Sequence, residues 1–161
     1  MAPSNRVALE LNPITTLSLY RPSATLEISI AHGLAVNLTP SVELALEGGV
    51  FGEVGLRRYT AVLSGFFIGV SAFAGAFSHL CEDSSVTRSA TVYGAAADVG
   101  YQWVTRRGVV IGLGAGAQLQ RSHTDCAVGG TEIEQALVVP SAATTGVLPR
   151  FQFAIGYAWG S

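Results

Sequence analysis

The sequence predicts an all-β protein in which eight antiparallel strands close into an up-and-down transmembrane β-barrel. Three observations predict this fold. Apolar residues alternate with small or polar ones along most of the chain, and a period of two is that of a β-strand. Hydrophobic residues make up 49% of the chain while charged residues make up only 12%, about half the globular average. Glycine is abundant, with 19 residues, which favours close-packed strands and turns over long helices.

Length and charge narrow the classes of function. A chain of 161 residues is expected to form one domain, residues 1–161, with a short N-terminal tail over residues 1–5 and a long loop over residues 121–149. The net charge is −2 and the chain has no lysine and no run of basic residues, which argues against a nucleic-acid partner. The two cysteines lack the spacing of a metal site, and neither a metal nor another cofactor is expected.

Four strands are expected in the first part of the chain, over residues 7–12, 23–31, 34–47 and 50–59. In the second of them, Leu26 and Ile28 share one face while Glu27 lies on the other, and the same alternation recurs in its neighbours. The strands are separated by turn signals, which are the two prolines after the first strand, His32-Gly33 after the second and Gly48-Gly49 after the third.

The segment 60–78 is open to two interpretations. It contains no charged residue and is long enough to cross a bilayer as a helix, and Gly65 and Gly69 have the spacing of a helix-pairing face. The other interpretation is a connection over residues 60–65, with a turn near Ser64-Gly65, followed by a strand over residues 66–79. The strand is favoured, because a single helix among seven strands would leave the sheet open and a sheet in lipid must close.

Three more strands are expected over residues 89–103, 109–120 and 150–159. Eight is an even number, as a closed antiparallel barrel of one chain requires. Several strands have the length of about ten residues that a tilted strand needs to cross a bilayer. The connections after the second, fourth and sixth strands are short, whereas those after the first, fifth and seventh are longer. Such a difference between the two ends is typical of membrane barrels, whose long loops face outside.

Alternation assigns one face of each strand to lipid and the other to the barrel interior. The residues expected to face lipid include Leu26, Ile28, Leu44, Leu113, Phe153 and Ile155. The charged residues expected inside, as a lumen ion-pair network, are Glu10, Glu27, Glu43, Glu53, Arg57, Asp98 and Arg150. Charges in a narrow, poorly solvated interior must pair or change their protonation. The main interpretation is a structural network that fills a closed lumen, because eight strands leave little more room than side chains need. The alternative is a conduit lined by carboxylates.

The last strand carries the most specific pattern in the sequence. Bulky apolar residues occupy every second position, at Phe151, Phe153, Ile155, Tyr157 and Trp159. The rings of tyrosine and tryptophan suit a membrane–water boundary. The aromatic residues expected at that boundary are Tyr101, Trp103, Tyr157 and Trp159.

The C-terminal segment resembles the strand signal of bacterial outer-membrane β-barrels, in which a polar residue and a glycine precede aromatics at alternate positions up to the chain end. The matching residues are Gln152, Gly156, Tyr157 and Trp159, although Gly160 and Ser161 follow where the family ends on the aromatic. The whole pattern resembles the small eight-stranded barrels of the OmpA-transmembrane-domain and OmpX type. The segment 11–13, Leu-Asn-Pro, is similar to one in uncharacterised outer-membrane barrel families.

This resemblance implies a location in the bacterial outer membrane, with a lipid bilayer or detergent around the barrel. It also implies contact with the barrel-assembly machinery through the C-terminal strand. It carries no activity that could be transferred. Because residues 1–6 lack the charged start and apolar core of a signal peptide, the outer-membrane interpretation expects that a leader has been removed.

Export would bring the two cysteines into an oxidising compartment. Cys81 and Cys126 both fall in connections on the long-loop side of the predicted barrel. A disulfide between them is therefore expected, provided that their Cα atoms come within about 7 Å of each other.

No convincing catalytic residue is found, so the chain is not expected to be an enzyme. Ser78-His79 and Ser122-His123 are the only Ser-His pairs, but neighbouring residues on a strand face opposite sides. Neither pair matches the His-x-Ser-Asn pattern of lipid-A deacylase barrels. The expected function is that of a structural or interaction barrel whose loop 121–149 contacts an unknown protein or surface ligand. The alternatives are a small ion or solute pore, a lipid-modifying enzyme, and a soluble lipocalin-like barrel with its apolar residues inside around a ligand.

Overall fold

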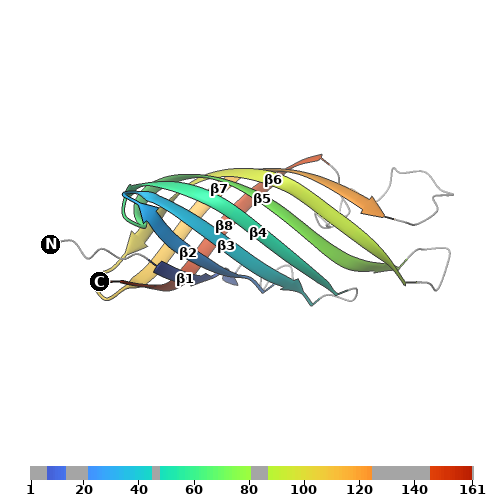
Figure 1. Ribbon diagram of the computed structural model, residues 1–161, viewed down its shortest axis with the longest axis horizontal. Helices are drawn as coiled ribbons and strands as arrows, with labels where there is room; N and C mark the ends of the chain where they lie inside the picture. Colours follow the sequence, from blue (N-terminus) through green and yellow to red (C-terminus); the bar gives the residue numbers. More distant parts are fainter. Residues whose placement is uncertain (1–6, 14–21, 45–47, 81–86, 125–145, 161) are drawn as a thin grey trace.

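Eight antiparallel strands form one closed barrel in which each strand pairs with the next and β8 pairs with β1 (Figure 1). This computed structural model describes residues 7–13, 22–44, 48–80, 87–124 and 146–160. The strands are β1 (Val7–Leu11), β2 (Ala24–Ala31), β3 (Leu34–Glu43), β4 (Gly49–Ala61), β5 (Ser64–Leu80), β6 (Thr87–Val104), β7 (Val109–Thr124) and β8 (Gly146–Trp159). The predicted all-β, eight-stranded antiparallel barrel is confirmed.

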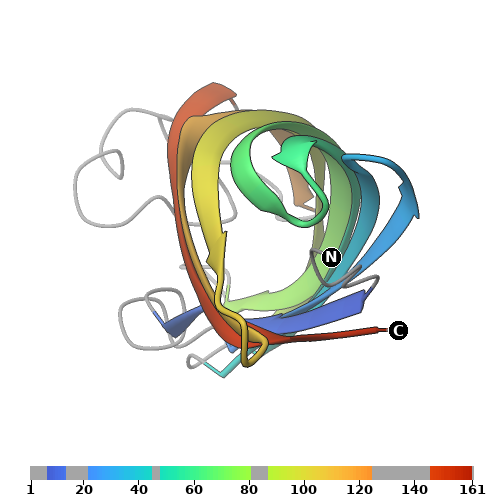
Figure 2. The ribbon, with the colours of Figure 1, turned by 90° about the vertical axis from the view of Figure 1, so that its left-hand side faces the viewer.

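The short turns lie together at one end of the barrel, which we call the turn end; the opposite end is the far end. His32-Gly33 joins β2 to β3, Val62-Leu63 joins β4 to β5, and residues 105–108 join β6 to β7. β1 begins at this end and β8 finishes there, since Val7 pairs with Trp159. Seen from this side, the hairpin of β4 and β5, in green, bends over the barrel opening (Figure 2).

The outer face of the sheet is apolar. Every strand exposes large hydrophobic side chains, with exposed fractions of 59% for Ile68 and 70% for Phe151. Of the residues predicted to face lipid, Ile28, Leu44, Leu113 and Ile155 are exposed and Leu26 and Phe153 are half-buried. The inner face holds buried carboxylates, among them Glu27, which is fully buried. This arrangement is the reverse of the one expected for a soluble lipocalin-like cup.

Aromatic rings and glycines are complementary on the inner face. A Cβ atom added to Gly94 would lie 2.6 Å from Cζ of Phe73, and one added to Gly100 would lie 2.5 Å from Cζ of Phe67. Glycines on one strand therefore leave the space that rings from the next strand occupy. An eight-stranded barrel encloses a lumen about as wide as side chains, and here this space is divided between the two residue types.

The segment 60–78 forms part of two strands and not a helix. The turn between β4 and β5 is Val62-Leu63, which is tighter than the predicted connection over residues 60–65. Leu63 has a φ of 48°, in the left-handed region that favours glycine, although neither residue of this turn is a glycine. Within the described residues, no helix is long and apolar enough to cross a membrane.

The strands at the far end of the barrel differ from the predicted bounds. β3 ends at Glu43 and not at residue 47. β7 continues to Thr124 and β8 begins at Gly146, so both ends of the predicted loop 121–149 belong to strands. Arg121 pairs with Tyr93 on β6, which shows the physical reason: a long neighbouring strand extends the backbone pairing beyond the residues whose alternation is apolar.

Replacing Gly75 by alanine should lower the free energy of unfolding by about 1–3 kcal/mol, because the added methyl group meets the buried ring of Phe51. Gly52→Ala is the matched control, since it lies on the adjacent strand β4 and nothing lies within 4 Å of a Cβ atom built there. Chemical denaturation of the folded barrel, followed by tryptophan fluorescence, measures both changes. Equal stability of the two variants would contradict a filled lumen.

Candidate functional site

Polar side chains from five strands meet inside the barrel. Each lies on the inner face because it alternates with an outward-facing neighbour on its strand. We call this group the central lumen network; its members are Glu10, Glu27, Arg57, Tyr59, Asp98, Gln102 and Gln152.

Arg57 on β4 is the only cation of this network. Its Nη2 atom donates a hydrogen bond of 2.6 Å to Oε1 of Gln152 and lies 3.9 Å from Oδ2 of Asp98. Its Nη1 atom lies 3.5 Å from Oε1 of Glu27. The amide of Gln152 in turn donates to Asp98, and the guanidinium carbon lies 4.8 Å from the centroid of the Phe67 ring. Arg57 therefore connects β4 to β2, β6 and β8 across the lumen.

Tyr59 and Gln102 satisfy the carboxylate of Glu27. The hydroxyl of Tyr59 lies 2.8 Å from both carboxylate oxygens of Glu27, to which it donates, and 3.0 Å from Oε1 of Gln102. Nε2 of Gln102 donates to Oε2 of Glu27 at 3.3 Å and to the carbonyl oxygen of Leu63 at 3.1 Å. Gln102 thus links the charged network to the turn between β4 and β5.

A second ion pair lies nearer the far end. Nη2 of Arg150 on β8 donates to the two carboxylate oxygens of Glu53 on β4, at 2.7 and 3.0 Å. Glu43 is half-buried at the end of β3 and makes no side-chain ion pair with another described residue. Of the residues predicted in the network, the structure brings together Glu10, Glu27, Arg57 and Asp98, pairs Glu53 with Arg150, and leaves Glu43 apart.

The central lumen network contains more carboxylates than cations. Glu10, Glu27 and Asp98 are all buried, and Arg57 is the one positive group among them. Oε1 of Glu10 has no hydrogen-bond partner within the described ranges. Burial of such groups is costly unless hydrogen bonds satisfy them, and Tyr59 supplies such bonds to Glu27. The central lumen network can therefore keep charged groups inside the barrel and fix the positions of its strands relative to one another.

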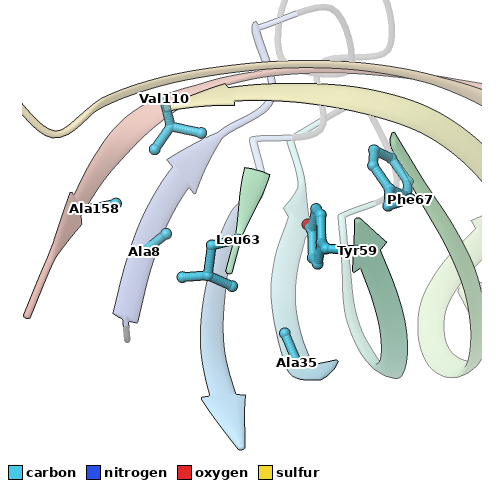
Figure 3. Packing of buried hydrophobic residues seen from close by; sticks show 7 residues of the cluster. All are labelled: Ala8, Ala35, Tyr59, Leu63, Phe67, Val110 and Ala158. Carbon is cyan, nitrogen blue, oxygen red and sulfur yellow. The ribbon is translucent and has the colours of Figure 1, made fainter. Parts of the chain in front are cut away.

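Apolar clusters flank the charged residues along the lumen. The cluster at the turn end comprises Ala8, Ala35, Tyr59, Leu63, Phe67, Val110 and Ala158 (Figure 3). The cluster toward the far end comprises Phe51, Phe77, Ala90 and Val92, with Phe73 packed against it. Along β4, Arg57 lies between the two, so the charged layer has apolar side chains on both sides.

Sequence reasoning missed the role of Tyr59. It marked this residue only as the end of the fourth strand, although Tyr59 is two positions from Arg57 and therefore on the same face. It used Gln152 only as part of the C-terminal strand pattern, and it gave Gln102 no role in the lumen. The alternation of faces along each strand could have placed all three residues inside the barrel. Their partners could not be predicted, because they depend on how the strands are staggered relative to one another.

The remaining predicted sites have different outcomes. Cys81 and Cys126 lie outside the described residues, so their disulfide stays a prediction. The ring centroids of Tyr101 and Trp103 are 4.5 Å apart, and those of Tyr157 and Trp159 are 6.3 Å apart, in the parts of β6 and β8 near the turn end.

Of the two Ser-His pairs, only Ser122-His123 has both side chains among those that the structure describes, and the two face opposite sides of β7. Ser122 is half-buried whereas His123 is exposed, as expected for neighbours on a strand. Among the residues that the structure describes, no group of three or more His, Cys, Asp or Glu could hold a metal ion.

Comparison with known proteins yields no match to a protein-family model, to a curated protein or to a solved structure. A function for this chain must therefore be inferred from its fold, its lumen and its outer surface.

Tyr59→Phe should lower the free energy of unfolding by about 1–3 kcal/mol, because it leaves the buried carboxylate of Glu27 without its hydroxyl donor. Tyr93→Phe is the matched control, since the Tyr93 side chain is 52% exposed on the outer face of β6. Denaturant titration measures both. The double variant Glu27→Gln/Tyr59→Phe should lose less than the sum of the single losses; strict additivity would show that the two groups do not interact.

Proposed function

We propose that this chain is a membrane-embedded structural or interaction barrel with a closed, side-chain-filled lumen and no catalytic activity. The observation that carries the proposal is the inverted distribution of side chains: the outer face is apolar around the whole barrel, while Glu27, Arg57 and Asp98 are buried inside.

The outer face supports a bilayer as the surroundings. Val50, Ile68 and Phe66 have exposed fractions of 62%, 59% and 67%, and comparable side chains continue over every strand. An apolar surface of this extent on a protein in water leads to association, because each buried Å² of apolar surface gains about 25 cal/mol. In a bilayer the same surface needs no further partner, and closure of the sheet satisfies the backbone groups that lipid cannot.

The lumen supports a closed barrel. The ring of Phe67 and the side chain of Leu63 are both more than nine-tenths buried at the turn end. Leu63 is held there by its own carbonyl, which accepts from Gln102. Together with Arg57 and its partners, these buried side chains fill part of the lumen.

A small pore is the second candidate. The observation in its favour is the excess of carboxylates, since Glu10, Glu27 and Asp98 surround the single cation Arg57. A lumen of this charge would prefer cations. The closed barrel is favoured because the apolar cluster with Leu63 and Phe67 lies between this charged layer and the turn end.

The proposal includes a location and partners. The bacterial outer membrane fits the apolar outer face and the aromatic residues of β8, the strand that closes the barrel against β1 and that we propose is recognised by the barrel-assembly machinery. An unknown protein or surface ligand is proposed to bind the connection 125–145, which lies outside the described residues.

Spin labels on cysteine variants test the bilayer. Labels at Leu113 and Val70, on the outer face, should be accessible to oxygen and protected from a water-soluble nickel complex, because oxygen concentrates in lipid. A label at Gln118, which is half-buried on the inner face, is the control and should show lower oxygen accessibility. Nickel accessibility at Leu113 and Val70 in a soluble, monodisperse preparation would contradict the proposal.

Planar-bilayer recording tests the closed lumen. The protein should give no steady unitary current, whereas Leu63→Ala/Phe67→Ala, which empties the turn-end cluster, should conduct and prefer cations. Phe66→Ala/Leu113→Ala is the control, since it removes similar side chains from the outer face and should stay silent. A steady current through the unaltered protein that changes with Arg57→Ala or Glu43→Ala would establish the pore.

A further inference from the structure

Three exposed arginines and three aromatic rings, of which Tyr101 is half-buried, form a strip at the turn end of the barrel. Arg58 is near the end of β4, Phe66 near the start of β5, and the remaining members lie at the end of β6 and in the following turn. We call this strip the basic aromatic rim; its members are Arg58, Phe66, Tyr101, Trp103, Arg106 and Arg107.

The rings of the rim touch one another across two strands. Phe66 and Tyr101 are paired residues whose rings meet edge to face with centroids 4.8 Å apart, and the Tyr101 and Trp103 centroids are 4.5 Å apart. Arg58 pairs with Ile68, two residues from Phe66 on the same face, so it borders the first ring. The turn with its two arginines begins two residues after Trp103.

Among the described residues, no acid neutralises the positive charge of the rim. The side chains of Arg58, Arg106 and Arg107 are exposed. No Asp or Glu in the described ranges has an exposed side chain, and the nearest acids on these strands, Glu53 and Asp98, face the lumen. The other acidic residues of the sequence are Glu47, Glu82, Asp83, Asp125, Glu132 and Glu134, which fall in the segments between β3 and β4, β5 and β6, and β7 and β8.

We propose that the basic aromatic rim binds the headgroups of anionic phospholipids. Guanidinium groups bind phosphate oxygens through two parallel N–H donors, and amphipathic rings lie at the level of the headgroups. The rim continues directly into the apolar outer face, because the paired residues Ile68 and Val99 lie two positions farther from the turn end than Phe66 and Tyr101. A ligand that meets arginine at one level and apolar side chains at the next has a phosphate head and a hydrocarbon tail.

This proposal rests on the proposed membrane location and adds a preferred lipid to it. The chain has two tryptophans, so Trp159→Phe leaves Trp103, inside the rim, as the only one. This variant is reconstituted in bilayers that contain either phosphatidylglycerol or phosphatidylcholine brominated near the glycerol end of the acyl chains. Quenching of Trp103 fluorescence then reports which lipid occupies the rim.

At equal mole fraction, brominated phosphatidylglycerol should quench more strongly, with a relative binding constant of at least about fivefold, because each basic residue near an anionic surface adds favourable energy. The preference should disappear in Arg58→Gln/Arg106→Gln/Arg107→Gln and shrink in high salt. Arg121→Gln is the control, since Arg121 is an exposed arginine toward the far end of β7 and its loss should change nothing.

The outcomes separate the two proposals. Equal quenching by both lipids, or a preference that survives both high salt and loss of the three arginines, would overturn the lipid site while leaving the membrane barrel in place. No quenching by either lipid would overturn the membrane location itself. If the triple variant fails to fold, two other measurements replace it. The first uses the single variants Arg106→Gln and Arg107→Gln, both in an exposed turn. The second is the salt titration of the protein that keeps all three arginines.

Discussion

The pairing of β1 with β8 is the contact on which the rest of the structure depends. It removes both edges of the sheet, so that no row of backbone donors and acceptors is left open. Closure at eight strands also sets the width of the lumen to about that of side chains. The size of each inner side chain therefore limits the size of its neighbours. The ring of Phe67, for example, requires its cross-strand partner Gly100 to have no side chain.

Within that narrow space, the charged residues fix strand positions more than they add stability. Two charges taken out of water lose hydration, and their attraction offsets this loss only when hydrogen bonds satisfy the remaining atoms. Arg57 reaches Glu27, Asp98 and Gln152, which stand on three other strands. A register slip of one residue would turn an inward side chain outward, so the partners of Arg57 select one register around the barrel.

Local patterns in the sequence were sufficient for the strands and their faces, because alternation depends only on the geometry of one strand. The pattern separates Glu53 and Arg57 from Val54, and they lie on opposite faces in the structure. The pattern could not show which face lies inside, because membrane barrels and soluble barrels have the same alternation. It also could not show that Tyr59 reaches Glu27 across β3, because that contact depends on how the strands are staggered relative to one another. The predicted strand ends were wrong at two places. The residues of β7 after Gln120 are polar and no longer show the alternation, and the turn at Val62-Leu63 has no glycine to mark it.

The shapes of the side chains are less constrained on the outer face than in the lumen. In the proposed bilayer Ile68, Val99 and Leu113 need only be apolar, because fluid hydrocarbon would adapt its shape to them, whereas a lumen ring must match a particular glycine. The outer surface can therefore vary in shape while it keeps its charge pattern. Among the described side chains that pattern is uneven along the axis, since Arg58, Arg106 and Arg107 are exposed at the turn end whereas Arg121 is the one arginine exposed toward the far end. A barrel with one basic rim has a preferred direction in a bilayer whose two surfaces differ in charge, independently of anything in its lumen.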